Sequence, residues 1–115
     1  MKRRFRLRSS ADFERVRRLG KSFAHPLVVL VLLNTHGDDI RIAVAAGRRL
    51  GNAVQRNRAK RQIRAAIQPL LANICPGHDL ILIARPPLIT AGFEDLMIAL
   101  RSLLLRAEIL KADAN

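Results

Sequence analysis

The segment from Ile40 to Ala84 decides the fold of this chain, because it places one long helix pattern between two strand patterns. It begins with Ile40-Arg-Ile-Ala-Val-Ala-Ala46 and ends with Leu80-Ile-Leu-Ile-Ala84. The first run alternates, as a strand with one buried face does, whereas the second is continuously apolar, as in a central strand covered on both faces. Between them, Asn52 can cap a helix that runs to about Asn73. This order predicts a βαβ crossover in which the two strands pair in parallel.

The flanking segments add helices and strands on both sides of this unit. Ser9 can cap a short helix that ends at about Leu19, before Gly20. Residues 23–33 predict a strand, with a shorter strand before it that is broken at Pro26. We expect the strand at 40–46 to pair antiparallel with this segment. A last helix is predicted from about Thr90 to Leu110, with Phe93 and Leu100 on its apolar face.

These patterns together predict one α+β domain over residues 1–115, with the order α-β-β-β-α-β-α and helices packed on a small mixed sheet. Residues 1–8 lack a helical period and predict an extended or mobile basic arm at the start of the domain. A chain of 115 residues is the usual size of a single domain.

The charge of the chain is concentrated in two blocks. Residues 1–21 hold nine basic and two acidic side chains, residues 48–64 hold seven basic and none acidic, and the whole chain carries +12. Half of the residues are hydrophobic, at 50%, which argues against intrinsic disorder. Two cationic blocks on a nearly neutral remainder indicate a folded protein that binds a polyanion through phosphates.

The sequence also indicates in which cellular compartment the protein is expected. Cys75 is the single cysteine of the chain, so no intramolecular disulfide is expected, and no signal segment opens the sequence. The longest apolar run, Leu27–Leu33, is far shorter than the roughly 20 residues that cross a bilayer. We therefore expect a cytoplasmic protein with no membrane partner.

Cations gather on one flank of the helix predicted after Asn52. At about 100° per residue, this flank lies beside an apolar stripe that contains Ala59 and Ile63. It consists of Arg56, Asn57, Lys60, Arg61 and Arg64. An ordinary solvated helix face mixes both signs of charge, whereas this one has no carboxylate to relieve the repulsion. Arg56 is expected to face inward toward a groove, and the helix predicts a set of phosphate contacts.

Other polar residues do not form a catalytic or metal site in the sequence. His25, His36 and His78 lack partners at metal-ligand spacing, and Cys75 is expected to be an inert thiol. No nucleophile–base set, phosphate loop or carboxylate pair is present, so no catalytic residue and no metal ligand is predicted. Asp79 is expected to be a turn residue or an ion-pair partner of an arginine.

The string Gly51-Asn-Ala-Val-Gln-Arg-Asn-Arg-Ala-Lys-Arg-Gln-Ile-Arg64 closely resembles the signature helix of the bacterial ribonuclease P protein component. The resemblance extends over nearly the whole chain. It includes Asp12-Phe13 with Val16, Gly20 and Ser22, the basic pair before Gly51, Asp79, and the strand end Ile83-Ala-Arg-Pro86.

The resemblance implies a two-layer α/β sandwich, similar to a ribosomal protein domain, with a left-handed βαβ crossover. It implies a subunit of an endoribonuclease whose active site is RNA and which removes the 5′ leader of precursor tRNA. The implied partners are ribonuclease P RNA and precursor tRNA, with no DNA expected, and Mg²⁺ is held mainly by the RNA subunit. The chain itself is implied to contain no catalytic residue.

The same resemblance assigns site residues. The RNA-binding set is Arg48, Arg49, Asn52, Arg56, Asn57, Arg58, Lys60, Arg61 and Arg64. The leader cleft is assigned to Phe13, Arg17, Val31, Ala45 and Gly47. Of these, Arg17 and Val31 stand where the family commonly has aromatic residues, and Ala45 and Gly47 stand where it often has serines. Leader binding is therefore expected to depend on charge and aliphatic contact more than on base stacking.

Two other functions are compatible with the basic composition. A structural RNA-binding protein or RNA chaperone would bind tRNA equally well with and without a leader, whereas a ribonuclease P subunit would prefer the longer leader. A DNA-binding regulator is less consistent with the sequence, because no turn-linked helix pair is present and the basic helix lies inside a βαβ unit.

Overall fold

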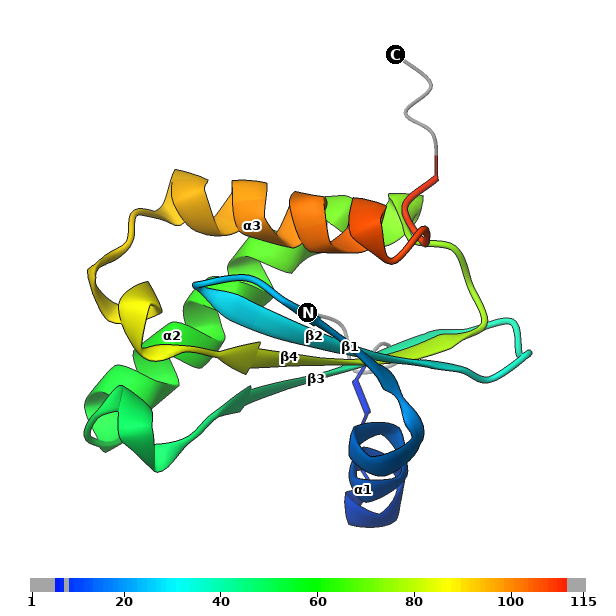
Figure 1. The fold of residues 1–115 in the computed structure, drawn as a ribbon, viewed down its shortest axis with the longest axis horizontal. Helices are drawn as coiled ribbons and strands as arrows, with labels where there is room; N and C mark the ends of the chain where they lie inside the picture. Colours follow the sequence, from blue (N-terminus) through cyan, green and yellow to red (C-terminus); the bar gives the residue numbers. More distant parts are fainter. Residues whose placement is uncertain (1–5, 8, 112–115) are drawn as a thin grey trace.

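The computed structural model describes residues 6–7 and 9–111, and its elements follow the predicted order (Figure 1). The elements are α1 (Ser10–Leu19), β1 (Lys21–Ala24), β2 (Val28–Asn34), β3 (Ile40–Ala46), α2 (Ala53–Ile67), β4 (His78–Ala84) and α3 (Phe93–Arg106). The α+β class and the order α-β-β-β-α-β-α are confirmed.

The four strands form one mixed sheet in the order β1-β2-β4-β3. β4 pairs antiparallel with β2 and parallel with β3, so that Leu80 lies opposite Leu32 on one side and Ile42 on the other. The predicted parallel pairing is confirmed, but the expected antiparallel pairing of β3 with the preceding strand is wrong. β4 separates them, because Leu80, Ile81 and Leu82 are all 0% exposed and a central position covers both faces of this strand.

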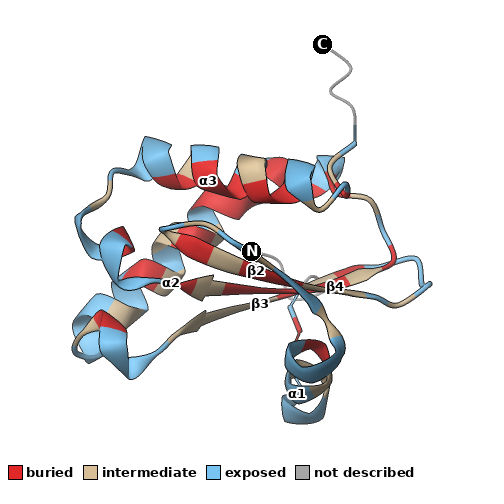
Figure 2. Ribbon diagram, viewed as in Figure 1, coloured by how far each residue is buried: buried red, intermediate tan, exposed pale blue. Residues whose placement is uncertain are grey.

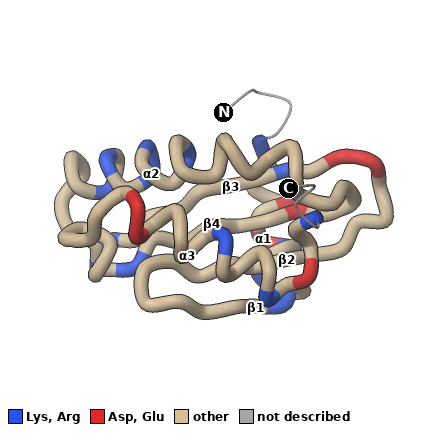
Figure 3. Tube along the Cα trace, turned by 90° about the horizontal axis from the view of Figure 1, so that it is seen from above, with Lys and Arg blue, Asp and Glu red and all other residues tan. Residues whose placement is uncertain are grey.

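The connection from β3 through α2 to β4 is a left-handed crossover. In Figures 1 and 3, α2 and α3 lie over one face of the sheet and α1 lies under the other. Seen from the α2 side with β3 and β4 pointing upward, β4 lies to the left of β3. About 98% of parallel βαβ connections have the opposite hand. The general rule would thus have predicted the wrong hand, and the family resemblance predicted the observed one.

The two faces of the sheet carry separate hydrophobic clusters. Figure 2 shows buried positions on the helices of both faces. The larger one packs α2 and α3 on the sheet and includes Ile63 and Leu100, both 0% exposed. The smaller one lies beneath α1. Its buried residues are Leu7, Val16, Val31 and Ile81, and partly buried side chains pack against them, namely Phe13, Val29, Leu33, Ala43 and Ile83. Val16 is the one buried residue of α1. The apolar anchorage of α1 is therefore small and independent of the core that holds α2.

α2 is shorter than its sequence pattern predicts. It ends at Ile67 instead of about Asn73, and Gln68–Asn73 continue as a 3-10 helix. Pro69 explains the change, because it has no N–H for a hydrogen bond within an α-helix.

α3 is also shorter at both ends than the predicted span from Thr90 to Leu110. Its N-cap is Gly92, and Pro86–Thr90 form a separate 3-10 helix before it. After Arg106 the chain turns, and Leu110 forms an isolated antiparallel bridge with Ile74. Among the described residues, no helix combines the length and the apolar character needed to traverse a membrane.

Two residues of the predicted basic arm lie along the edge of β3. Arg6 forms a parallel bridge with Ile42, and the Leu7 N–H donates to the Ile42 carbonyl at 2.9 Å. Leu7 is buried at 8% exposure and joins the cluster beneath α1. These two residues of the arm are extended and docked on the sheet. Residues 1–5 and 8 lie outside the described residues.

Gly20 permits a close approach between the end of α1 and β2, and we expect Gly20→Ala to destabilise the protein. A Cβ at this position would lie 2.5 Å from the Val16 carbonyl oxygen and 2.8 Å from Val31 Cγ1. The free energy of unfolding should fall by about 1–3 kcal/mol, as for other overpacked sites. Urea unfolding measures this loss. Gly47→Ala is the matched control, because nothing lies within 4 Å of a Cβ at Gly47, and its stability should change by less than about 0.5 kcal/mol.

Candidate RNA interface

α2 begins in a reciprocal cap that fixes its first turn beside the basic loop. The Gln55 N–H donates to the Asn52 side-chain oxygen at 2.9 Å, and the Asn52 N–H donates to the Gln55 side-chain oxygen at 3.0 Å. Gly51 before the cap has φ 142°, a backbone conformation that favours glycine. The Asn52 side-chain oxygen is thus used in capping, and its NH₂ group is the part that can donate to RNA.

The cations of α2 surround its buried stripe and reach solvent. Ala59 and Ile63 face the core at 1% and 0% exposure. Around them, the exposed polar residues are Asn57, Arg58 and Arg61, and the half-buried ones are Arg56, Lys60 and Arg64. Within the described chain, none of these cations pairs with a carboxylate, nor does Arg48 or Arg49. Lys and Arg positions recur along α2 in Figure 3, so this helix presents uncompensated positive charge.

A pocket of about 210 Å³ opens where α1, the edge of β3 and α2 meet. It is lined by Arg6, Leu7, Phe13, Ile42, Ala43, Val44 and Arg64. The aromatic ring of Phe13 and the aliphatic side chains can contact a base, and the guanidinium groups of Arg6 and Arg64 can contact phosphate. The α2 cation that lines this pocket is Arg64. Arg56, which is expected to face inward, is half-buried.

A second pocket, of about 280 Å³, lies at the carboxyl ends of β3 and β4. Its lining combines three arginines with apolar side chains, namely Gly47, Arg48, Arg49, Leu50, Ile83, Ala84, Arg85 and Pro86. Arg85 is absent from the predicted RNA-binding set. Parallel pairing places Ala46 opposite Ala84, so the residues that follow these two positions meet at one edge. The parallel register was the signal that could have identified Arg85.

The predicted cleft residues do not all come together. Phe13 lines the first pocket and Gly47 lines the second. Ala45 is half-buried and lies near the end of β3, two residues before Gly47. The Arg17 side chain is 61% exposed and pairs with Glu14 at 3.3 Å.

Val31 needs a correction as a cleft residue. It is 3% exposed and packs beneath α1, because its strand position faces Val16 across the smaller cluster. It supports α1 from below and offers no open surface to a leader.

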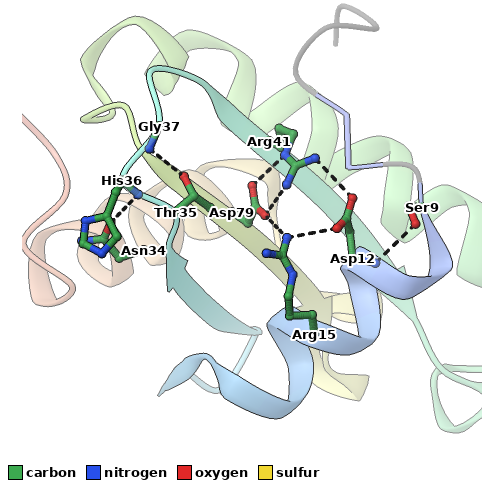
Figure 4. A network of polar contacts seen from close by, with 9 residues as sticks. All are labelled: Ser9, Asp12, Arg15, Asn34, Thr35, His36, Gly37, Arg41 and Asp79. Atoms are coloured by element: carbon green, nitrogen blue, oxygen red, sulfur yellow. Dashed lines mark hydrogen bonds and ion pairs between the residues drawn. The ribbon is translucent and has the colours of Figure 1, made fainter.

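Asp79 is a buried ion-pair partner in β4 (Figure 4). At 1% exposure, it is the one buried charged or polar residue among those described. Its two carboxylate oxygens accept hydrogen bonds from Arg41 Nε at 2.9 Å and Arg41 Nη2 at 2.7 Å. Arg15 Nη2 donates to the same carboxylate at 3.3 Å. The expectation of an arginine partner is therefore confirmed, with two arginines in place of one.

Asp12 of α1 completes this cluster. Its carboxylate accepts from Arg15 Nη2 at 3.0 Å and from Arg41 Nη1 at 3.2 Å. The hydrogen bonds from Arg41 to Asp79 are the main reason that the pKa of the Arg41 guanidinium is raised above its usual value. We call Asp12, Arg15, Arg41 and Asp79 the α1 network.

The side chains of His25 and His78 make local hydrogen bonds with the backbone. The His25 Nδ1 atom accepts from the Leu27 N–H at 3.1 Å, and the His78 Nδ1 atom lies 2.9 Å from the Cys75 carbonyl oxygen. Cys75 is a half-buried free thiol. Among residues 6–7 and 9–111, no group of three or more His, Cys, Asp or Glu side chains is placed to hold a metal ion.

Comparison with known proteins shows what this chain is similar to. The family model described as Ribonuclease P matches residues 1–108. The ribonuclease P protein component of Herpetosiphon aurantiacus is 40% identical over 109 residues, covering 95% of this chain and 89% of that protein. That of Chloroflexus aurantiacus is 37% identical over 116 residues, covering 100% and 86%. The solved RNase P protein of Staphylococcus aureus is 30% identical and covers 93% of this chain and 98% of its own, with a TM-score of 0.82.

Proposed function

This chain belongs to the ribonuclease P protein family, and we propose that α2 binds ribonuclease P RNA while the edge of β3 guides the precursor tRNA leader. As a protein subunit of ribonuclease P, it acts in tRNA 5′ maturation as part of an endoribonuclease. The observation that carries the proposal is the carboxylate-free cationic face of α2, adjoining a pocket that holds both Phe13 and Arg64.

The proposed contact with the RNA subunit is electrostatic. From Arg56 to Arg64 the helix rises roughly 12 Å, which spans about two or three successive phosphates. Guanidinium groups bind phosphate oxygens in bidentate fashion, and the Asn57 amide can bridge phosphate or ribose. We assign this role to Asn52, Arg56, Asn57, Arg58, Lys60, Arg61 and Arg64, and we assign Arg48 and Arg49, which precede α2, to the leader path described next.

The proposed leader path runs along β3 from one pocket to the other. Val44 lines the first pocket and Gly47 lines the second, and three residues of strand span about 10 Å. We propose that Phe13 contacts a leader base at one end of this path. Arg48, Arg49 and Arg85 would hold leader phosphates at the other end. Together these contacts would favour precursor over mature tRNA.

The described residues do not fit a protein-held Mg²⁺, because they bring no suitable group of carboxylate, His or Cys side chains together. We propose that Mg²⁺ is held mainly by the RNA subunit, as the family resemblance implies. The contribution that we propose for the protein is to place cations between RNA segments, which lowers the repulsion between their phosphates.

Reconstitution with the cognate RNA tests the proposal. We expect the protein to increase precursor tRNA cleavage at low Mg²⁺ by about tenfold or more, within the usual range of coupling free energies. Single-turnover cleavage across a Mg²⁺ series measures the gain. The control is the same RNA at high Mg²⁺, where the gain should shrink because Mg²⁺ itself screens the phosphates. No gain at low Mg²⁺ would contradict the proposed role.

Leader dependence separates this function from that of a general RNA-binding protein or RNA chaperone. The holoenzyme should bind precursor tRNA more tightly than mature tRNA, with a preference that grows with leader length. Equal affinity for the two tRNAs would instead favour the general RNA-binding function.

A further inference from the structure

We propose that the α1 network positions Phe13 for the leader, with Asp79 as the central positioning residue. This inference rests on the proposed leader path. It assigns a specificity role to four residues that would touch neither the leader nor the RNA subunit: Asp12, Arg15, Arg41 and Asp79.

The network is the main polar link between α1 and the sheet. Arg41 comes from β3 and Asp79 from β4, and both reach residues of α1 (Figure 4). The network contains two carboxylates and two guanidinium groups, so its charges balance. Its arginines are thus committed to carboxylates, unlike the cations of α2. A network that is neutral and partly buried suits a structural joint better than a phosphate site.

α1 needs such a link because its apolar anchorage is small. Val16 is its one buried residue, Phe13 is only partly buried against the same cluster, and Leu19 at the end of the helix is 61% exposed. The cluster beneath α1 contains few buried side chains, whereas the cluster on the opposite face includes those of α2 and α3. Loosening the network should therefore allow α1 to shift while α2 stays in place.

The same strand holds both the network and the pocket. Arg41 binds Asp12, the residue next to Phe13, at 3.2 Å. Ile42, Ala43 and Val44, the residues that follow Arg41 on β3, line the pocket together with Phe13. The ion pair thus ties the backbone beside Phe13 to the strand that lines the pocket. This connection would set where the Phe13 ring stands relative to Arg64, which lines the same pocket.

Two pairs of variants of α1, tested in the full holoenzyme, separate this role from a simple charge effect. Asp12→Asn removes one carboxylate of the network, and its control Glu14→Gln removes the carboxylate of the exposed pair with Arg17. Arg15→Met removes one guanidinium of the network, and its control Arg18→Met removes the exposed guanidinium three residues later. Within each pair, the change in net charge is the same.

Three quantities are measured for each variant. The first is the leader preference, which is the ratio of the dissociation constants for mature and precursor tRNA. The second is the affinity of the protein for ribonuclease P RNA, and the third is the melting temperature of the free protein. Asp12→Asn and Arg15→Met should lower the leader preference by about five- to tenfold, the equivalent of roughly one base-stacking contact. Their affinity for ribonuclease P RNA should stay within about twofold of the unaltered protein, as expected when a substitution lies outside the contact surface. Glu14→Gln and Arg18→Met should keep the full preference.

The outcomes distinguish failure of this inference from failure of the proposed function. If the unaltered holoenzyme shows no leader preference, the leader path itself is refuted. If it shows the preference and both network variants retain it, the positioning role is refuted while the leader path stands. A parallel loss of RNA-subunit affinity in the network variants would indicate general destabilisation and would also overturn the positioning role.

Discussion

Replacing Arg56, Arg61 and Arg64 together with alanine is expected to weaken binding of ribonuclease P RNA by roughly a thousandfold at low salt. A hydrogen bond to a charged group contributes about 1.5 kcal/mol or more, so three such contacts account for about 4.5 kcal/mol. The salt slope is the slope of a plot of log affinity against log salt concentration. Each lost phosphate contact should also make this slope shallower by about one unit. Filter binding or anisotropy across a salt series measures both effects.

The matched control replaces the same three residues with lysine. Lysine keeps the positive charge but lacks the planar fork, so the salt dependence should be retained while part of the affinity is lost. The single variants Arg56→Ala and Arg61→Ala should each show a smaller loss of affinity and a smaller change of slope. An unchanged salt slope in the triple alanine variant would contradict phosphate contact at these positions.

The second large effect concerns the core beneath the same helix. Ile63→Ala is expected to lower the free energy of unfolding by about 3–4 kcal/mol, because it removes buried methyl groups and leaves a cavity. Ile63 is 0% exposed and lies in the cluster that packs α2 and α3 on the sheet. Urea or thermal unfolding of the free protein measures the loss. Since a small domain has a stability of only about 5–15 kcal/mol, this loss is a large fraction of the total.

Ile98→Ala provides the matched control for this substitution. Ile98 belongs to α3 but is 66% exposed, so the same chemical change should cost less than about 0.5 kcal/mol. Equal losses in the two variants would mean that Ile63 does not carry the packing of α2. Binding of ribonuclease P RNA should partly restore the stability of Ile63→Ala, because a ligand that binds only the folded state stabilises it.

In the proposed function, the helices on the two faces of the sheet have different roles. α2 is held by the larger cluster and presents cations without carboxylate partners within the described chain. α1 is held by the smaller cluster and the charge-balanced network around Asp79. The cations available to bind phosphate therefore lie on α2, whereas the arginines of the α1 network are used in structural ion pairs. Substitutions in the α1 network should therefore change leader recognition and leave binding of the RNA subunit largely unchanged.

The sequence by itself determined the features that depend on local periodicity. The 3.6-residue period around Ala59 and Ile63 identified α2 and its cationic flank, and the alternation from Ile40 to Ala46 identified β3. The continuous apolar run at Leu80 identified β4 as a central strand, and the long helix between β3 and β4 implied their parallel pairing. These patterns are carried by neighbouring residues, so a single sequence is sufficient to reveal them.

Only the tertiary structure decided which distant residues meet. In the folded protein β4 lies between β2 and β3, because this central position buries both apolar faces of β4. The tertiary structure buried Val31 beneath α1 and brought Arg85 beside Arg48. It also joined Asp79 to Arg15, 64 positions away in the chain. Strand order and register set these contacts, and both depend on long-range packing that local periodicity does not encode.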